Sequence, residues 1–331
     1  MTGRNRGLLR GSLGLAVSVG ALAIVVGSVD VGRTAAILGT ALPAWIALML
    51  AFQAADILLR AWRWQILVAP LKAVRFLPVL LYLLVGYLAN NVLPARLGEL
   101  VRCHYLGDRE RISRTATLGT VVVERVVDTA VVVAIASVAI LVLHVRGLVA
   151  SAVLVGLALT GLLVVALAIG LAAHRLPGIE RVITGAARWP RAVEVTVKLR
   201  SGLEVARRPR TLVGALVLSV AAWGATVVAF AAAGQALGIE MTTAQASLLA
   251  AGVALASAIP AGPSNLGTYD LAAVEIAATF GVPRPEALAL ALLAHASVLI
   301  VTSAGGAAAL LRLGWSRGRD RADDVAAAGS A

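Results

Sequence analysis

The sequence predicts an all-α integral membrane protein with about eight hydrophobic segments. Six of these are expected to span the bilayer, and two are expected to be broken, re-entrant segments. Of the 331 residues, 60% are hydrophobic and only 14% are charged, against roughly 45–50% and 25% in soluble domains. The mean hydropathy is +0.92. Charge-free stretches also recur at about the 20-residue length that a spanning helix needs, which excludes an ordinary soluble enzyme.

The hydrophobic segments follow one another along most of the chain. The first comes after Arg4, Arg6 and Arg10 and resembles a signal peptide. The segment is longer than the apolar core of a typical signal peptide, and no clean cleavage site follows it. We therefore expect a retained helix with a cytoplasmic N-terminus. The charged residues of the fourth are Glu124, Arg125 and Asp128. The segments cover residues 11–29, 34–55, 76–95, 116–145, 147–173, 211–239, 241–269 and 287–311.

The distribution of basic residues indicates how many segments cross the membrane. If all eight crossed, the basic residues in 96–114 and in 175–210 would lie outside, against the positive-inside rule. If the third and seventh segments return to the side they entered, basic residues gather in the cytoplasm. The exceptions are then Arg33, Arg146 and Arg284 outside and Arg125 in the membrane. We therefore expect six spanning helices and cytoplasmic N- and C-termini.

Helix-breaking residues lie where the two re-entrant segments would turn. They are Pro94 and Gly98 in the third segment and Pro260, Gly262 and Gly267 in the seventh. Backbone groups freed by such residues at membrane depth are tolerated only inside protein or beside a wet cavity. Paired broken helices predict inverted repeats, over residues 11–146 and 147–312, with a substrate site between them. The alternative is two unrelated loops that share common turn residues.

We expect one polytopic membrane domain over residues 1–312. Within it, residues 174–210 form a basic cytoplasmic loop with interspersed apolar residues, typical of an amphipathic helix on anionic lipid. Residues 313–331 are expected to be a disordered cytoplasmic tail.

Two groups of charged residues need a functional or structural reason. Glu124, Arg125 and Asp128 lie in an apolar helical run, where each charge costs roughly 2.5–3.5 kcal/mol and indicates function by default. Arg125 is within reach of Asp128 on the same helix or of an acid on another helix. The alternative is a helix that starts near Glu124 and keeps these charges at the interface.

Arg96, Glu99 and Arg102 follow Pro94 at a spacing of three and are expected to project toward one side of a helix. Arginine suits the bidentate binding of a lipid phosphate. The alternative is an internally paired helix cap that only sets topology.

Other polar residues have simpler interpretations. Arg60, Arg63 and Trp64 are expected to be interfacial anchors at headgroup depth, with direct headgroup contact as the alternative. His295 is expected to be a packing residue or a proton relay. The single Cys103 is an incidental thiol, and no metal or cofactor motif is present.

Several of these motifs together resemble a known family. They are residues 59–64, the Leu-Pro-x-Arg-x-Gly-Glu run within residues 90–102, Glu124-Arg125-x-x-Asp128, the turn at 260–270, and residues 281–283 and 287–289. This pattern is similar to the flippase-like transmembrane family, that of the transmembrane region of lysylphosphatidylglycerol synthases, and it covers about residues 13–311. The chain reads Gly262-Pro263-Ser264-Asn265-Leu266-Gly267 where Gly-Gly-x-Gly is often seen, so the headgroup preference is open.

The resemblance implies a bacterial inner-membrane protein that moves a lipid between leaflets. It does not imply the synthase reaction, because the chain to Ala331 holds no aminoacyltransferase domain, and we expect no enzyme activity or cofactor. The expected partners are membrane lipids and a lipid-modifying enzyme or glycosyltransferase, not nucleic acid. The expected substrate-binding residues are Arg96, Glu99, Arg102, Glu124, Arg125, Asp128, Asn90, Asn91, Asn265, Tyr269 and Asp270. The alternatives are an ion-coupled transporter of a small solute and a non-transporting membrane subunit.

Overall fold

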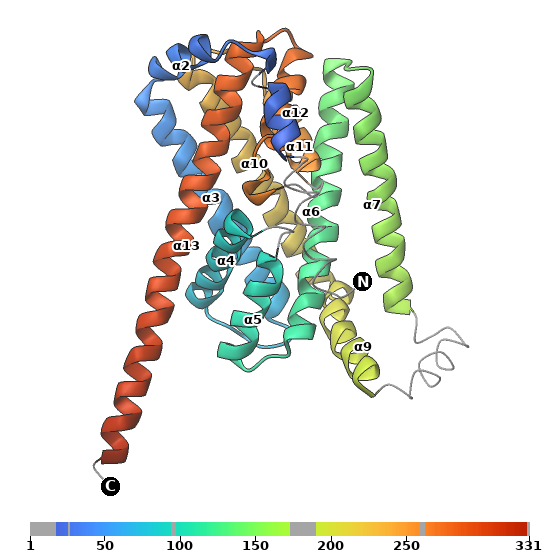
Figure 1. The fold of residues 1–331 in the computed structure, drawn as a ribbon. Helices are drawn as coiled ribbons and strands as arrows, with labels where there is room; N and C mark the ends of the chain where they lie inside the picture. Colours follow the sequence, from blue (N-terminus) through green and yellow to red (C-terminus); the bar gives the residue numbers. More distant parts are fainter. Residues whose placement is uncertain (1–17, 26, 94–96, 173–189, 258–261, 330–331) are drawn as a thin grey trace, which may run out of the picture.

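In the computed structural model, the chain folds into a bundle of helices (Figure 1). The structure describes residues 18–25, 27–93, 97–172, 190–257 and 262–329, and within these ranges it is helical and contains no strand, as predicted. The helices are α2 (Val31–Gly39), α3 (Pro43–Val68), α4 (Phe76–Val92), α5 (Gly98–Glu110), α6 (Arg114–Leu143), α7 (Leu148–Ala172), α9 (Pro190–Leu203), η4 (Glu204–Arg207), α10 (Pro209–Ala236), α11 (Thr243–Ala256), η5 (Pro263–Asn265), α12 (Thr268–Ala278) and α13 (Arg284–Gly329).

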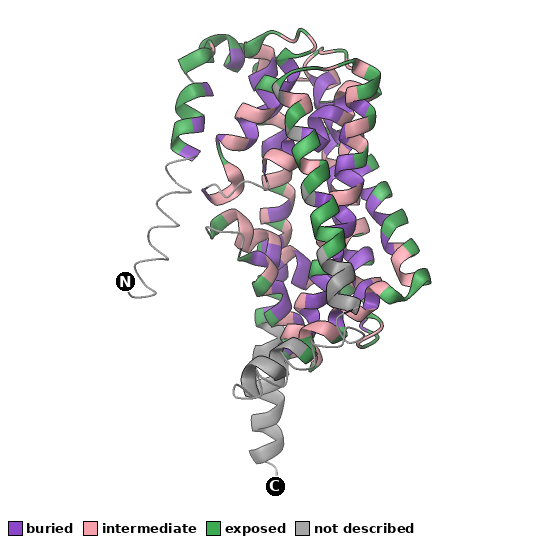
Figure 2. Ribbon diagram, turned by 90° about the vertical axis from the view of Figure 1, so that its right-hand side faces the viewer, coloured by how far each residue is buried: buried purple, intermediate pink, exposed green. Residues whose placement is uncertain are grey.

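The bundle has the length and surface of a membrane-spanning protein. Within the described ranges, four helices are long and apolar enough to cross a bilayer, namely α3, α6, α10 and α13. Large apolar side chains such as Leu141, Leu154 and Val217 are exposed on the outside. Figure 2 shows exposed residues along the outer faces and buried residues between the helices. These outer faces suit contact with lipid, whereas the number of six spans stays a prediction.

The helices begin at residues whose chemistry favours a helix start. Pro43 and Pro209 occupy the first turns of α3 and α10, where proline loses no hydrogen bond. The side chain of Ser113 accepts a hydrogen bond from the amide of Ala116 at the start of α6. Thr242 and Gln245 form a capping box at the start of α11. Local sequence therefore fixes where the long helices start.

Two helix pairs are broken where the sequence predicts. Helix α4 ends at Val92 and α5 begins at Gly98, while α11 ends at Ala256 and α12 begins at Thr268. Figure 1 shows α4 and α5 in the lower half of the bundle and α11 and α12 in the upper half, so each pair returns toward the end it came from. The two breaks meet, because the Ser264 hydroxyl donates to the carbonyl of Asn91 at 2.9 Å. Re-entrance in a membrane stays a prediction.

Glycines make close backbone contacts at these breaks. A Cβ atom on Gly98 would overlap the carbonyl of Gly86, so α5 approaches α4 there at backbone distance. Gly267 has φ +83 and lies against the backbone of residues 18–22. The amide of Gly262 donates to the Ser18 hydroxyl at 2.8 Å. Pro94, Arg96 and Pro260 lie outside the described residues.

Different helix ends and loops contact one another at the two ends of the bundle. At one end, Lys72 donates to the carbonyl of Glu110 at 2.7 Å, and Arg109 donates to that of Leu313 at 2.7 Å. At the other end, Arg33 pairs with Glu286 at 3.1 Å. Three regions that the charge distribution placed on one side therefore share an end, namely the connection after α3, the connection after α5 and the α13 segment around Leu313. The assignment of this end to the cytoplasm stays a prediction.

The structure differs from the sequence expectations in two segments. Helix α13 continues to Gly329 instead of ending before a disordered tail. Residues 313–329 contain no proline that would end the helix. The second hydrophobic segment is interrupted after α2, and its long helix extends from Pro43 to Val68.

Within the expected amphipathic loop, α9 packs on α6 through a contact between Gly119 and Gly202. Residues 173–189 lie outside the described ranges.

Candidate functional site

Charged side chains from three helices meet inside the bundle and form what we call the buried ion-pair cluster. Helix α3 supplies residues at helical spacings of four and three, which place them on one face. Helix α6 supplies two acids at a spacing of four, and α5 supplies one arginine. The members are Asp56, Arg60, Arg63, Arg102, Glu124 and Asp128.

Two acids on α6 organise the cluster. Asp128 accepts hydrogen bonds from Arg63 at 2.6 Å, Arg60 at 3.1 Å and the Trp223 indole at 2.8 Å. Glu124 is held bidentately by Arg102, with N···O distances of 3.0 and 3.2 Å, and also accepts from Arg63 at 3.1 Å.

Aromatic rings cover two of the cationic groups. The guanidinium of Arg60 lies 4.8 Å from the ring centroid of Trp223, and that of Arg102 lies 4.7 Å from the centroid of Trp64. Such contacts add a further attraction to each cation.

The cluster is electrically balanced, since three arginines face three acids. Burial of ions costs several kcal/mol each, and close pairs with additional hydrogen bonds repay this cost. The fully buried Arg63 also donates to the Ser219 hydroxyl at 2.7 Å. A balanced cluster can therefore persist inside an otherwise apolar bundle, and the loss of one member would leave an uncompensated charge.

This geometry corrects two expectations about arginines. Arg63 and Trp64 have no exposed surface, so neither is an interfacial anchor, and Arg60 faces the interior as well. Their charges are compensated by α6, which allows α3 to carry them into the bundle. Arg102 is 3% exposed, and both its terminal nitrogens bind Glu124, so it is not available to a lipid phosphate.

Arg125 pairs with an acid on another helix rather than with Asp128. Its Nη2 lies 3.0 Å from Oε1 of Glu99 on α5, and the two side chains are 42% and 19% exposed. Glu99 and Arg102 thus both face α6, as their spacing predicts. Glu124 and Asp128 are buried, and α6 begins at Arg114, which contradicts the alternative of a helix that starts near Glu124.

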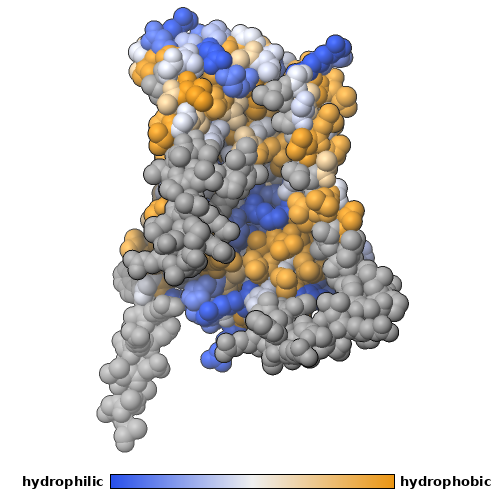
Figure 3. Space-filling view, turned by 45° about the vertical axis from the view of Figure 1, so that its right-hand side comes forward, coloured by the Kyte–Doolittle hydropathy of each residue, from blue (hydrophilic) through white to orange (hydrophobic). Residues whose placement is uncertain are grey.

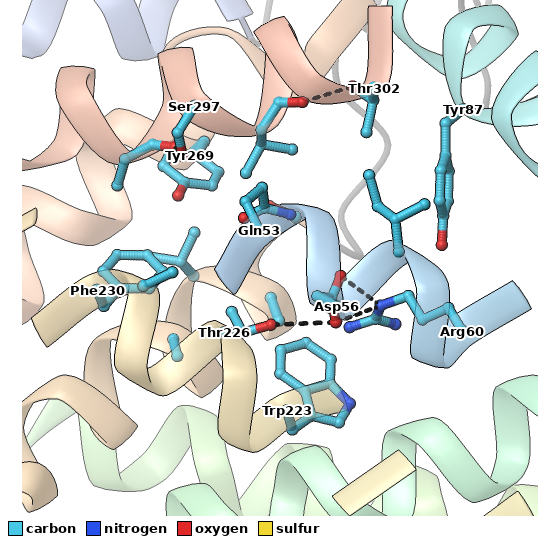
Figure 4. Close-up of a pocket in the computed structure, with 18 of the residues that line it drawn as sticks. Gln53, Asp56, Arg60, Tyr87, Trp223, Thr226, Phe230, Tyr269, Ser297 and Thr302 are labelled. Atoms are coloured by element: carbon cyan, nitrogen blue, oxygen red, sulfur yellow. Dashed lines mark hydrogen bonds and ion pairs between the residues drawn. The ribbon is translucent and has the colours of Figure 1, made fainter. Parts of the chain in front are cut away.

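A cavity of about 240 Å³, lined by both polar and apolar side chains, lies beside the cluster. Both broken helix pairs contribute to its wall, together with α3, α6, α10 and α13. Figure 4 shows Asp56 and Arg60 near one side of the cavity, Tyr269 and Ser297 near the other, and Gln53 between them. Of the residues predicted to bind substrate, Asn90, Asn91, Arg125 and Tyr269 line the cavity.

The asparagines on the cavity wall are tied to the surrounding helices. Asn90 accepts a hydrogen bond from the amide of Gly98 at 2.7 Å, and Asn91 donates to the hydroxyls of Thr302 and Ser303 at 2.8 and 2.9 Å. Asn265 is not among the lining residues and has φ +54 in the turn before α12.

Behind Tyr269 lies a second polar pair. Nδ1 of His295 is 3.1 Å from Oδ1 of Asp270, and Nε2 is 3.0 Å from the carbonyl oxygen of Ser264. The other Asp270 oxygen accepts from the amide of Gly267 at 3.0 Å. Both ring nitrogens face acceptors, so a proton must lie between His295 and Asp270. Tyr269 stacks on His295 with a centroid distance of 4.1 Å.

Sequence reasoning missed several residues of the site. Asp56 stands four residues before Arg60, and that spacing was a signal of an intrahelical pair. Ser219, Trp223 and Thr226 share one face of α10 toward the cluster, and Thr226 donates to Asp56 at 3.3 Å. Their residue types are common in spanning helices, so nothing in the sequence singles them out. In the described ranges, no three His, Cys, Asp or Glu side chains come together to hold a metal ion.

Comparison with known proteins agrees with this architecture. None of the curated proteins matches the sequence. The family described as the lysylphosphatidylglycerol synthase TM region matches residues 11–306. This match indicates a membrane-embedded role related to lipids. Because the match covers nearly the whole chain, the protein belongs to the lysylphosphatidylglycerol synthase transmembrane-region family.

Proposed function

We propose that the protein translocates a phospholipid or lipid-linked headgroup between the leaflets of a bacterial inner membrane. The observation that carries this proposal is a cavity, with charged and polar side chains in its wall, that lies where the two broken helix pairs meet. Transporters commonly place their substrate sites at such paired broken helices. Membership of a lipid-related membrane family supports a lipid as the substrate.

The cavity would lower the cost of carrying a headgroup across hydrocarbon. Arg60 takes the place that the sequence assigned to Arg102, because it lines the cavity and its side chain keeps 12% exposure. Figure 3 shows hydrophilic surface about halfway along one face, with apolar surface above and below it. Such a face would let a headgroup enter while the acyl chains stay in lipid. Without a coupled energy source, the protein would equilibrate the leaflets.

The test is lipid scrambling by the purified protein in liposomes. Labelled phospholipid in the outer leaflet is bleached by dithionite, and the rate at which inner-leaflet lipid becomes accessible is measured. Ser297→Leu fills the cavity without touching the buried ion-pair cluster, and Ala304→Leu on the exposed face of α13 is the matched control. We expect fast scrambling by wild type and Ala304→Leu and slow scrambling by Ser297→Leu. Equal rates for all three, or for wild type and empty liposomes, would refute the proposal.

The second candidate is an ion-coupled transporter of a small solute. The contact between Asp270 and His295 behind the cavity wall favours it, since a shared proton there offers a coupling site. Glu124 and Asp128 would not belong to this relay, because arginines hold both. Proton-driven solute uptake without added lipid substrate would support this candidate. A role as a non-transporting subunit of a lipid-modifying enzyme would be disfavoured by scrambling with the purified protein alone.

A further inference from the structure

We infer that the cavity selects a phosphoester of a neutral polyol, meaning a monoanionic phosphate that carries a hydroxyl-bearing group, and disfavours a cationic headgroup. The inference rests on the proposed function for the source of this ligand, which would be a lipid. The chemistry of the headgroup follows separately, from three features of the cavity wall: its acids, its arginines and its unpartnered neutral groups.

The negative charge of the one acid at the cavity is already compensated by an ion pair. Asp56 is the sole acid among the described residues that line the cavity. Nε of Arg60 lies 2.8 Å from each of its oxygens, and Thr226 donates to Oδ1 at 3.3 Å. Asp270 and Glu99 are not among the lining residues, and they pair with His295 and Arg125. An ammonium group in the cavity would therefore meet arginines and no uncompensated carboxylate.

The arginines at the cavity retain donors for an anion. Arg60 uses Nε on Asp56 and Nη1 on Asp128, and the hydrogen bonds of the described residues leave its Nη2 without a partner. Arg125 uses Nη2 on Glu99, and 42% of its side chain is exposed. Acids already pair with both arginines, so a phosphate would bind through their remaining N–H donors, and a singly charged phosphodiester offers two free oxygens to accept from them. Guanidinium groups also match phosphate oxygens in geometry.

Farther along the cavity lie two neutral groups whose hydrogen-bonding capacity is not used within the protein. Gln53 is 6% exposed and Tyr269 is 9% exposed. Within the described part of the chain, neither the Gln53 amide nor the Tyr269 hydroxyl has a hydrogen-bond partner. Buried polar groups are almost always paired, and both groups can donate and accept. Hydroxyl groups of a ligand have the same dual capacity and would satisfy both.

The two kinds of group are separated along α3. Gln53 and Arg60 lie seven residues apart, which is two helical turns or about 10 Å along the axis. Figure 4 shows both bordering the same cavity, with Tyr269 on the far side of Gln53 from Arg60. A phosphate at Arg60 would not reach Gln53 by itself. A polyol esterified to that phosphate would extend toward Gln53 and Tyr269.

The test compares equilibrium binding of short-chain lipids to the purified protein in detergent. The lipids are phosphatidylglycerol and phosphatidylinositol, which carry a polyol, and phosphatidic acid, phosphatidylethanolamine and lysylphosphatidylglycerol, which do not offer a neutral polyol. We expect the first two to bind most tightly. Tyr269→Phe and Gln53→Leu should each weaken them about three- to tenfold, the range for one lost hydrogen bond, and leave phosphatidic acid unchanged. Tyr105→Phe and Gln235→Leu, outside the cavity wall, should change nothing.

The outcomes separate headgroup chemistry from the transport proposal. The inference would be overturned if lysylphosphatidylglycerol bound as tightly as phosphatidylglycerol or more tightly. It would also be overturned if Tyr269→Phe and Gln53→Leu weakened phosphatidic acid binding as much as they weaken binding of the two polyol lipids. Glycerophosphoglycerol and glycerophosphoinositol, which are the same singly charged phosphodiesters without acyl chains, form a second arm, and binding of these as tight as the lipids would support the headgroup chemistry but overturn a lipid source. A missing polyol preference with normal scrambling refutes this inference alone. A preserved preference without scrambling refutes the translocator proposal alone.

Discussion

Replacement of Arg63 by methionine should destabilise the protein more than any substitution of a surface arginine. Arg63 has no exposed surface and binds Asp128, Glu124 and Ser219 at once. Methionine fills similar space without a charge. The buried ion-pair cluster would then hold three acids and two arginines, which leaves one negative charge uncompensated inside the bundle.

The expected loss in free energy of unfolding is about 3–5 kcal/mol, the range for removal of one partner from a buried pair. The double variant Arg63→Met with Asp128→Asn restores the balance of charges, so it should lose less than the sum of the two single variants. Arg33→Met is the control, because Arg33 is 60% exposed in its pair with Glu286. An exposed pair contributes about 0–1 kcal/mol.

Unfolding by sodium dodecyl sulfate in mixed micelles, followed by tryptophan fluorescence or circular dichroism, measures these free energies. The reasoning would be refuted if Arg63→Met lost no more than Arg33→Met. It would also be refuted if the double variant lost the full sum of its parts, since the charge balance would then contribute nothing.

Three further predictions address neighbouring features. Arg125→Met should cost only about 1 kcal/mol in the same titration, because its pair with Glu99 is partly exposed; a loss as large as that of Arg63→Met would contradict this. Gly202→Ala should loosen α9 from α6 by about 1–3 kcal/mol, since its Cβ would overlap the carbonyl of Ala116. Hydrogen exchange in residues 190–207 measures this loosening, and Gly214→Ala, with no atom nearer than 3.7 Å, should leave it unchanged. In a Cys103→Ala background, a cysteine at Arg111 should react only with reagent on the cytoplasmic side and one at Arg33 only from outside; the reverse pattern would exclude the proposed orientation.

The sequence by itself determined the class of the protein and the positions of its breaks. Apolar stretches of spanning length require helices in a bilayer, because the backbone must satisfy its own hydrogen bonds there. The interruptions between α4 and α5 and between α11 and α12 follow from proline and glycine, whose effects on the backbone are local. The buried state of Glu124 and Asp128 also followed from their place in a long apolar run.

The partners of each charge were decided only by the tertiary structure. Helical spacing shows that Asp56, Arg60 and Arg63 share a face, but it does not show which helix that face meets. Arg63 and Trp64 resemble surface anchors until α6 supplies the acids that allow their burial. Arg125 pairs with Glu99 because α5 folds back against α6, which the separation of these residues along the chain does not reveal. The cavity likewise exists because the breaks at Asn91 and Ser264, far apart in sequence, meet in space. The energy of a buried charge depends on what surrounds it, and packing alone sets those surroundings.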